Sequence, residues 1–156
     1  MNQQELSTLL TSLRSQSQET EWVEFKENNT DPDQIGEYLS ALSNSAAMHR
    51  KDAAYIVWGV ENGTHNVVGT SFNLGQAKKG SEELENWLLR LLAPRIDMKI
   101  HEFQENGHAV VIFEVQPAQH TPVAFSGTEY IRVGSLKKKL KEYPEKERAL
   151  WLFFSE

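Results

Sequence analysis

The chain has 156 residues, of which 39% are apolar and 10% aromatic, a length and composition typical of one folded domain. Its formal net charge of −6 at pH 7 argues against a protein that coats bulk polyanion, because strong nucleic-acid domains usually carry a basic excess. The sequence contains no cysteine, which excludes disulfides, thiolate metal sites and thiol nucleophiles.

In the first half of the chain, apolar spacing and turn residues predict alternating helices and strands. Asp31 and Pro32 are typical of the N-cap and first position of a helix. An Asn-Gly pair at 62–63 predicts a hairpin turn. The predicted elements are a helix over 2–15, an extended stretch over 19–26, a helix over 32–48, a buried strand over 53–60 and its hairpin partner over 67–69.

The second half contains further hairpins between two helices. A second Asn-Gly pair at 106–107 joins two strands, and Pro94 ends the helix before them. The predicted elements are a helix from Ser81, strands over 98–104 and 108–116, a short hairpin over 123–126 and 129–133, and a helix over 144–154. This order predicts an α+β fold in a single domain over 1–156, with helices packed on a mostly antiparallel sheet of about six strands.

The extended stretch over 19–26 is unusually charged. Alternation along a strand places Glu24 and Lys26 on one face and Glu19 on the other, unless a bulge near Thr20 brings the carboxylates together. Three interpretations remain open. They are an edge strand protected by its charges, a solvated Glu24–Lys26 ion pair, and a cluster of carboxylates held together for metal chemistry.

Positive charge gathers near the C-terminal end. Residues 1–75 carry four Lys or Arg against ten Asp or Glu, whereas residues 76–156 carry twelve of each, so a basic patch can survive the acidic total. Residues 130–141 contain no acid. Flexible cations beside a Gly-Ser turn can hold phosphates, although such a run can also form a solvated patch. The predicted nucleic-acid contacts are Arg132, Ser135, Lys137, Lys138, Lys139 and Lys141, with Lys78, Lys79 and Tyr130 extending the surface.

Short motifs in one order give a family resemblance. They are Glu19 with Glu24 to Lys26, and the segments 41–44, 56–61, 68–69, 92–94, 110–115, 122–123 and 130–135. In this order they resemble the AlbA-2 domain, also called the Schlafen AlbA-like domain. The matching pieces span residues 19–135. The sequence departs from the family where a Gly-Gly pair usually follows the Asn, because a longer charged segment occupies 45–52.

The resemblance implies a nucleic-acid-binding domain, with DNA favoured over RNA, from a bacterial transcriptional regulator or RecG-related helicase-like protein. The chain would then be the N-terminal part of a longer cytoplasmic protein. The sequence shows no apolar leader and no run approaching ~18 apolar residues, so we expect no membrane association. It also lacks a Walker A loop, and ATP-dependent activity would belong to other regions.

Two alternatives are retained. In the Schlafen branch related residues form a metal-dependent endoribonuclease site, which the resemblance maps onto Glu19, Glu24, Lys26 and Glu61, with the three carboxylates holding Mg²⁺ or Mn²⁺. The other alternative is a protein-interaction module. Its docking surface for a second subunit or a following region would be Trp151, Phe153 and Phe154.

Overall fold

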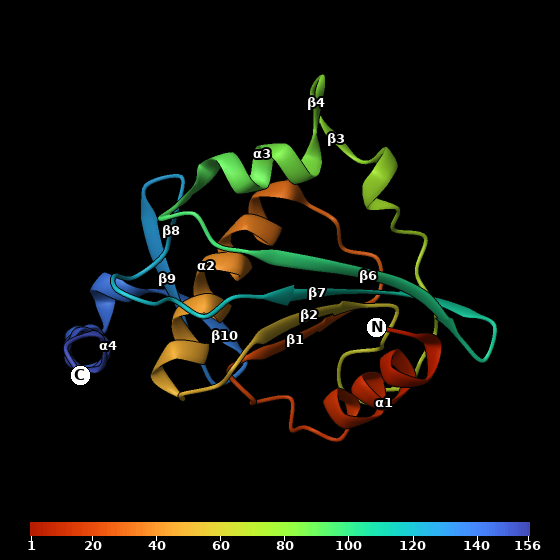
Figure 1. Cartoon of the computed structure of the whole chain (residues 1–156), viewed down its shortest axis with the longest axis horizontal. Coiled ribbons are helices and arrows are strands. Elements are labelled where there is room, and N and C mark those ends of the chain that lie inside the picture. The colour runs from red at the N-terminus through yellow and green to blue at the C-terminus, as the bar shows by residue number, and fades with distance from the viewer.

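The computed structural model describes residues 1–156 and contains two four-stranded sheets and a two-stranded ribbon (Figure 1). In the first sheet, of order β1-β2-β7-β6, β1 runs parallel to β2 and the other pairs are antiparallel; the strands are β1 (Val23–Lys26), β2 (Ala54–Trp58), β6 (Met98–Glu105) and β7 (His108–Val115). The second sheet is antiparallel, with the order β10-β9-β8-β5; its strands are β5 (Leu92–Ala93), β8 (Ala124–Phe125), β9 (Thr128–Val133) and β10 (Leu136–Lys139).

Four α-helices surround the sheets. They are α1 (Gln3–Arg14), α2 (Pro32–Met48), α3 (Leu84–Leu91) and α4 (Pro144–Phe154), with short 3₁₀ turns η1 (Leu74–Gln76) and η2 (Leu140–Glu142). In Figure 1, α1 and α4 lie at opposite ends of the molecule, and the ribbon of β3 (Lys78–Lys79) and β4 (Glu82–Glu83) projects beside α3. No helix is both long enough and apolar enough to cross a bilayer.

The first sheet is covered on both faces. On one face α2 contributes Leu39 and Leu42 to the main core, where Trp58 and Phe113 pack. On the other face α1 contributes Leu10 to a smaller cluster. Its other buried members are Leu13, Val23, Phe25, Val57, Val60, Val110 and Ile112. Burial on both faces explains why β2 is almost continuously apolar in sequence.

A polar face of α2 holds the second sheet. The Asn44 side chain donates to the carbonyl oxygens of Val123 (3.0 Å) and Tyr130 (2.8 Å) and accepts from the Val123 N–H (2.7 Å). Ser45 Oγ accepts from the Arg132 N–H at 3.1 Å. These side chains satisfy the backbone of β9 and of the segment before β8, so α2 fixes where β9 lies.

The structure confirms the α+β fold class and the helices predicted over 2–15, 32–48 and 144–154. The single sheet of about six strands is wrong in arrangement, because the strands divide into two sheets and a ribbon. The helix predicted from Ser81 begins later, at Leu84, since Glu82 and Glu83 pair with Lys79 and Lys78. The hairpin predicted over 67–69 is reduced to one bridge, between Val60 and Val67.

Candidate functional site

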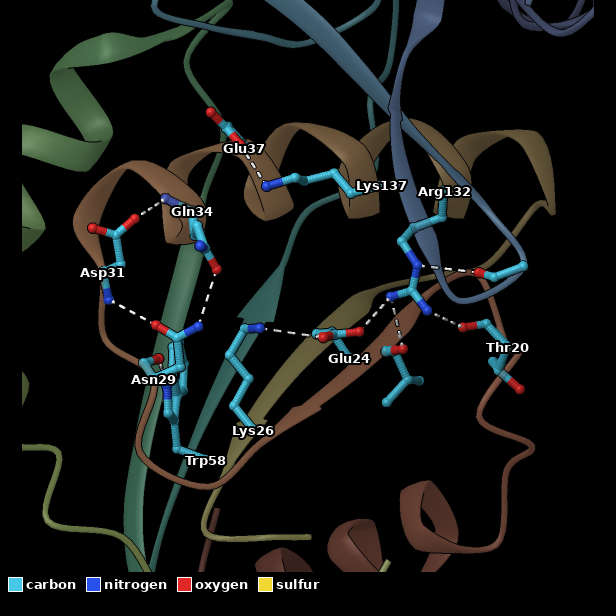
Figure 2. A network of polar contacts seen from close by, with 12 residues as sticks. Thr20, Glu24, Lys26, Asn29, Asp31, Gln34, Glu37, Trp58, Arg132 and Lys137 are labelled. Atoms are coloured by element: carbon cyan, nitrogen blue, oxygen red, sulfur yellow. Dashed lines mark hydrogen bonds and ion pairs between the residues drawn. The ribbon is translucent and has the colours of Figure 1, made fainter. Parts of the chain in front are cut away.

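A buried charge network lies where β1 faces α2 and β9 (Figure 2). Val23 and Phe25 of β1 point into the smaller apolar cluster beneath α1, so Glu24 and Lys26 point to the other face of the sheet. One Glu24 carboxylate oxygen lies 3.3 Å from Lys26 Nζ, and the other lies 3.0 Å from Arg132 Nη1. The predicted Glu24–Lys26 pair is therefore present, but it is not solvated, because these side chains are only 12% and 9% exposed.

Arg132 closes this network from β9. Its guanidinium donates to three carbonyl oxygens, those of Val23 (3.1 Å), Thr20 (3.4 Å) and Gly134 (3.2 Å), in addition to Glu24. The side chain has no exposed surface. The expectation that Arg132 presents its charge to a phosphate is therefore corrected, since its guanidinium is buried and donates four hydrogen bonds inside the protein.

The turn between β9 and β10 is fixed by Glu21. Gly134, with φ of +60°, donates its N–H to Glu21 Oε2 at 2.7 Å, while His49 Nε2 lies 2.6 Å from the other carboxylate oxygen. Burial by itself raises the pKa of Glu21, but the hydrogen bonds from His49 and Gly134, with the positive charges of His49 and Lys146, outweigh it and hold the pKa below its usual value. The Gly134 N–H is thus not free for a phosphate, whereas Ser135 beside it is exposed.

The predicted metal site is not formed. Glu19 is exposed and precedes β1, whereas Glu61 follows β2 in a turn closed by the Glu61–Asn66 and His65–Glu61 backbone hydrogen bonds. In that turn the His65 ring packs on Phe25, on the face of β1 opposite Glu24. No group of three or more His, Cys, Asp or Glu side chains is placed to hold a metal ion. Glu19, Glu24 and Glu61 therefore do not fit Mg²⁺ or Mn²⁺ as one ligand set.

The second charged region is the lysine run, which we define as Lys137, Lys138, Lys139 and Lys141. The first three belong to β10, an edge strand, rather than to a loop or helix start. Lys137 pairs with Glu37 of α2. Lys138, Lys139 and Lys141 make no ion pair or side-chain hydrogen bond, and Lys139 and Lys141 are exposed.

Tyr38 links the two regions. Lys26 Nζ lies 4.3 Å and Lys137 Nζ 4.8 Å from the centroid of its ring. Burial and then the negative charge of Glu24 raise the pKa of Tyr38 to about 12. Tyr38 and Glu37 were not predicted from the sequence, because Tyr38 has the helical spacing of an ordinary core residue and no local pattern places Glu37 opposite β10.

The predicted aromatic docking surface is only partly exposed. Trp151 is 44% exposed, whereas Phe153 and Phe154 are half-buried against the main core. Leu152, at 60% exposure, is the other open apolar side chain of α4.

Comparisons with known proteins give one family and two similar structures. The model of the family described as Schlafen, AlbA_2 matches residues 19–141. The DIP2311 protein from Corynebacterium diphtheriae has a similar structure, with a TM-score of 0.53 and 17% identity over 94% of this chain and 28% of that chain. The N-terminal domain of a RecG-related protein from Nitrosomonas europaea gives a TM-score of 0.49 and 20% identity, over 83% of this chain and 88% of that chain. No curated protein matches. This chain thus spans 28% of the DIP2311 structure, and likeness at these identities describes the fold alone.

Proposed function

Because the chain belongs to the Schlafen AlbA_2 family, we propose that it binds nucleic acid, and that the contact surface is β10 with the residues that follow it. DNA is the first polymer to test, as expected for a domain of a transcriptional regulator or of a RecG-related protein. The family match supports the class of ligand, and the placement of the lysine run supports the surface.

The single observation that carries the proposal is the contrast in pairing among the cations. Lys138, Lys139 and Lys141 have no acidic partner, although the chain as a whole has a net charge of −6. Lys138 and Lys139 lie in the edge strand β10, and Lys141 lies in the turn η2 that follows it. Lys139 and Lys141 are exposed, and Lys138 is partly exposed. Unpaired ammonium groups on a flexible stem are the groups that neutralise backbone phosphates and release counterions.

The number of unpaired lysines sets the expected salt dependence. If these three lysines each neutralise one phosphate of duplex DNA, log affinity should fall against log salt with a slope of roughly −2.7. Between about 50 and 200 mM salt this corresponds to a loss of ~40-fold in affinity. A slope near zero would be inconsistent with phosphate contacts.

The proposal is tested by fluorescence anisotropy with a short labelled DNA duplex, the matching single strand and an RNA of the same sequence. The variant Lys138→Gln/Lys139→Gln/Lys141→Gln should lose most of the affinity and of the salt slope. A matched control, Lys51→Gln/Arg95→Gln/Lys99→Gln, removes three exposed cations elsewhere that make no ion pair and should bind as the wild type does. No binding by the wild type at low salt, or equal losses in both triple variants, would overturn the proposal.

A further inference from the structure

Lys137 is the one member of the lysine run that a carboxylate holds. We propose that Glu37 is an internal competitor, whose carboxylate occupies on Lys137 the position that a phosphate of the nucleic acid takes in the complex. This inference rests on the proposed function of β10 and adds a residue that restrains it.

The strand geometry places Lys137 in the path of a bound polyanion. Alternate residues of a strand share a face, so Lys137 and Lys139 point to the same side of the sheet. Their register partners on β9 are Arg132 and Tyr130, respectively. Glu37 of α2 pairs with Lys137 on this face. A phosphate backbone that contacts the unpaired Lys139 therefore reaches Lys137 as its next cation.

The Glu37 carboxylate accepts a hydrogen bond from the lysine run. Lys137 Nζ is the donor. Burial, followed by the negative charge of Glu37, raises the pKa of Tyr130, the β9 residue that lies opposite Lys139. A carboxylate and a phosphodiester both share one negative charge over two oxygens, so an ammonium arranged for one can serve the other.

The Lys137–Glu37 pair is also suited to exchange. Its side chains are 18% and 27% exposed, whereas Arg132 in the Glu24 network has no exposed surface. Pairs that reach solvent contribute little, and a second anion can displace one partner at small cost. The Tyr38 ring, 4.8 Å from Lys137 Nζ, keeps the ammonium in place when Glu37 leaves it.

The experiment is a double-mutant cycle on the full chain, with the same labelled duplex as probe. Glu37→Gln keeps the shape of the side chain and removes its charge, and should tighten binding by about two- to five-fold, the range of a partly exposed ion pair. In the Lys137→Gln background the same change should have no effect beyond that of Glu102→Gln. Glu102, exposed and unpaired on β6, controls for the loss of one negative charge.

The outcomes separate this inference from the proposed function. Tightening by Glu37→Gln only when Lys137 is present supports internal competition. Equal tightening in both backgrounds would mean general charge repulsion and would overturn internal competition. Internal competition would also be overturned if the wild type binds and Glu37→Gln leaves the affinity unchanged. In both cases the proposed function would still stand. If neither the wild type nor Glu37→Gln binds, both proposals are wrong. Unchanged melting temperatures show that the variants are folded.

Discussion

The Glu24 network and the lysine run contain similar residues in opposite states. In the network, Glu24 is paired on both carboxylate oxygens, and Arg132 is fully buried with four partners. In the lysine run, three of four ammonium groups have no partner. The fourth, that of Lys137, pairs with Glu37, and solvent reaches this pair. The two regions are adjacent, since Arg132 of β9 lies directly opposite Lys137 of β10.

The difference separates charges that build the fold from charges that remain available. A buried charge is tolerated only when it is paired and hydrogen-bonded, so the network residues hold β1, the 19–22 segment and β9 together. An exposed lysine contributes little to stability and keeps its capacity to bind an anion. Substitutions in the network should therefore change stability, and substitutions in the lysine run should change binding.

The largest effect is expected from Arg132→Met. This change removes four hydrogen bonds and leaves Glu24 paired with Lys26 alone, in a site where the Glu24 side chain is 12% exposed. Removing one member of a buried ion pair typically costs about 3–5 kcal/mol of unfolding free energy. Urea denaturation measures the loss.

The matched control for Arg132 is its cross-strand neighbour. Lys137→Met removes a cation of similar length whose ion pair reaches solvent, and should cost less than about 1 kcal/mol. A comparable loss of stability in both variants would show that the two regions do not differ in the way described.

A smaller loss is expected from Asn44→Ala in the α2 face that places β9. Asn44 is fully buried, and its amide satisfies two carbonyl oxygens and one N–H of the backbone. Leaving these groups without partners should cost about 2–3 kcal/mol, measured by urea denaturation. Ser43→Ala, which removes a single hydrogen bond to Gln116, should cost about 1 kcal/mol. The reverse order would contradict this role of Asn44.

Elements that depend on local chemistry could be predicted from the sequence. The helix over Pro32–Met48 was predicted with its bounds, because Asp31, Pro32 and the apolar spacing act within a few residues. The division into two sheets could not be predicted in the same way. It depends on which strands pair across long sequence separations. The apolar sequence of the buried strand β2 is compatible with one sheet or with two.

The candidate site divides along the same line. Period-two alternation correctly placed Glu24 and Lys26 on one face of β1. The burial of Arg132 and the pairing of Lys137 with Glu37 could not be inferred, since both require knowing that α2 and β1 approach the β9–β10 hairpin. A sequence shows which residues are charged, but only tertiary contacts show which of those charges are already neutralised.

A pH-dependent effect is expected from Glu21, which ties the β9–β10 turn to the network. Because the folded protein lowers the pKa of Glu21, ionised Glu21 stabilises the fold above the pKa that this carboxyl has in the unfolded chain, and the contribution is lost as pH falls through the lowered pKa. Thermal unfolding between about pH 6 and pH 3.5 should show a smaller decline for Glu21→Gln than for the wild type. Glu19→Gln, which removes a carboxylate without hydrogen bonds, should behave as the wild type does.

The smallest effect on stability is expected from Lys138→Gln. The side chain has no partner in the structure, so the unfolding free energy should change by no more than about 0.5 kcal/mol. Under the proposed function the same substitution removes one phosphate contact, and the salt slope of duplex binding should become shallower by about 0.9. A stability loss above about 1 kcal/mol with an unchanged slope would place Lys138 with the network rather than with the lysine run. A variant that leaves folding intact and changes only the slope would instead show that the edge of β10 is maintained for a ligand, because such a charge contributes nothing to the fold.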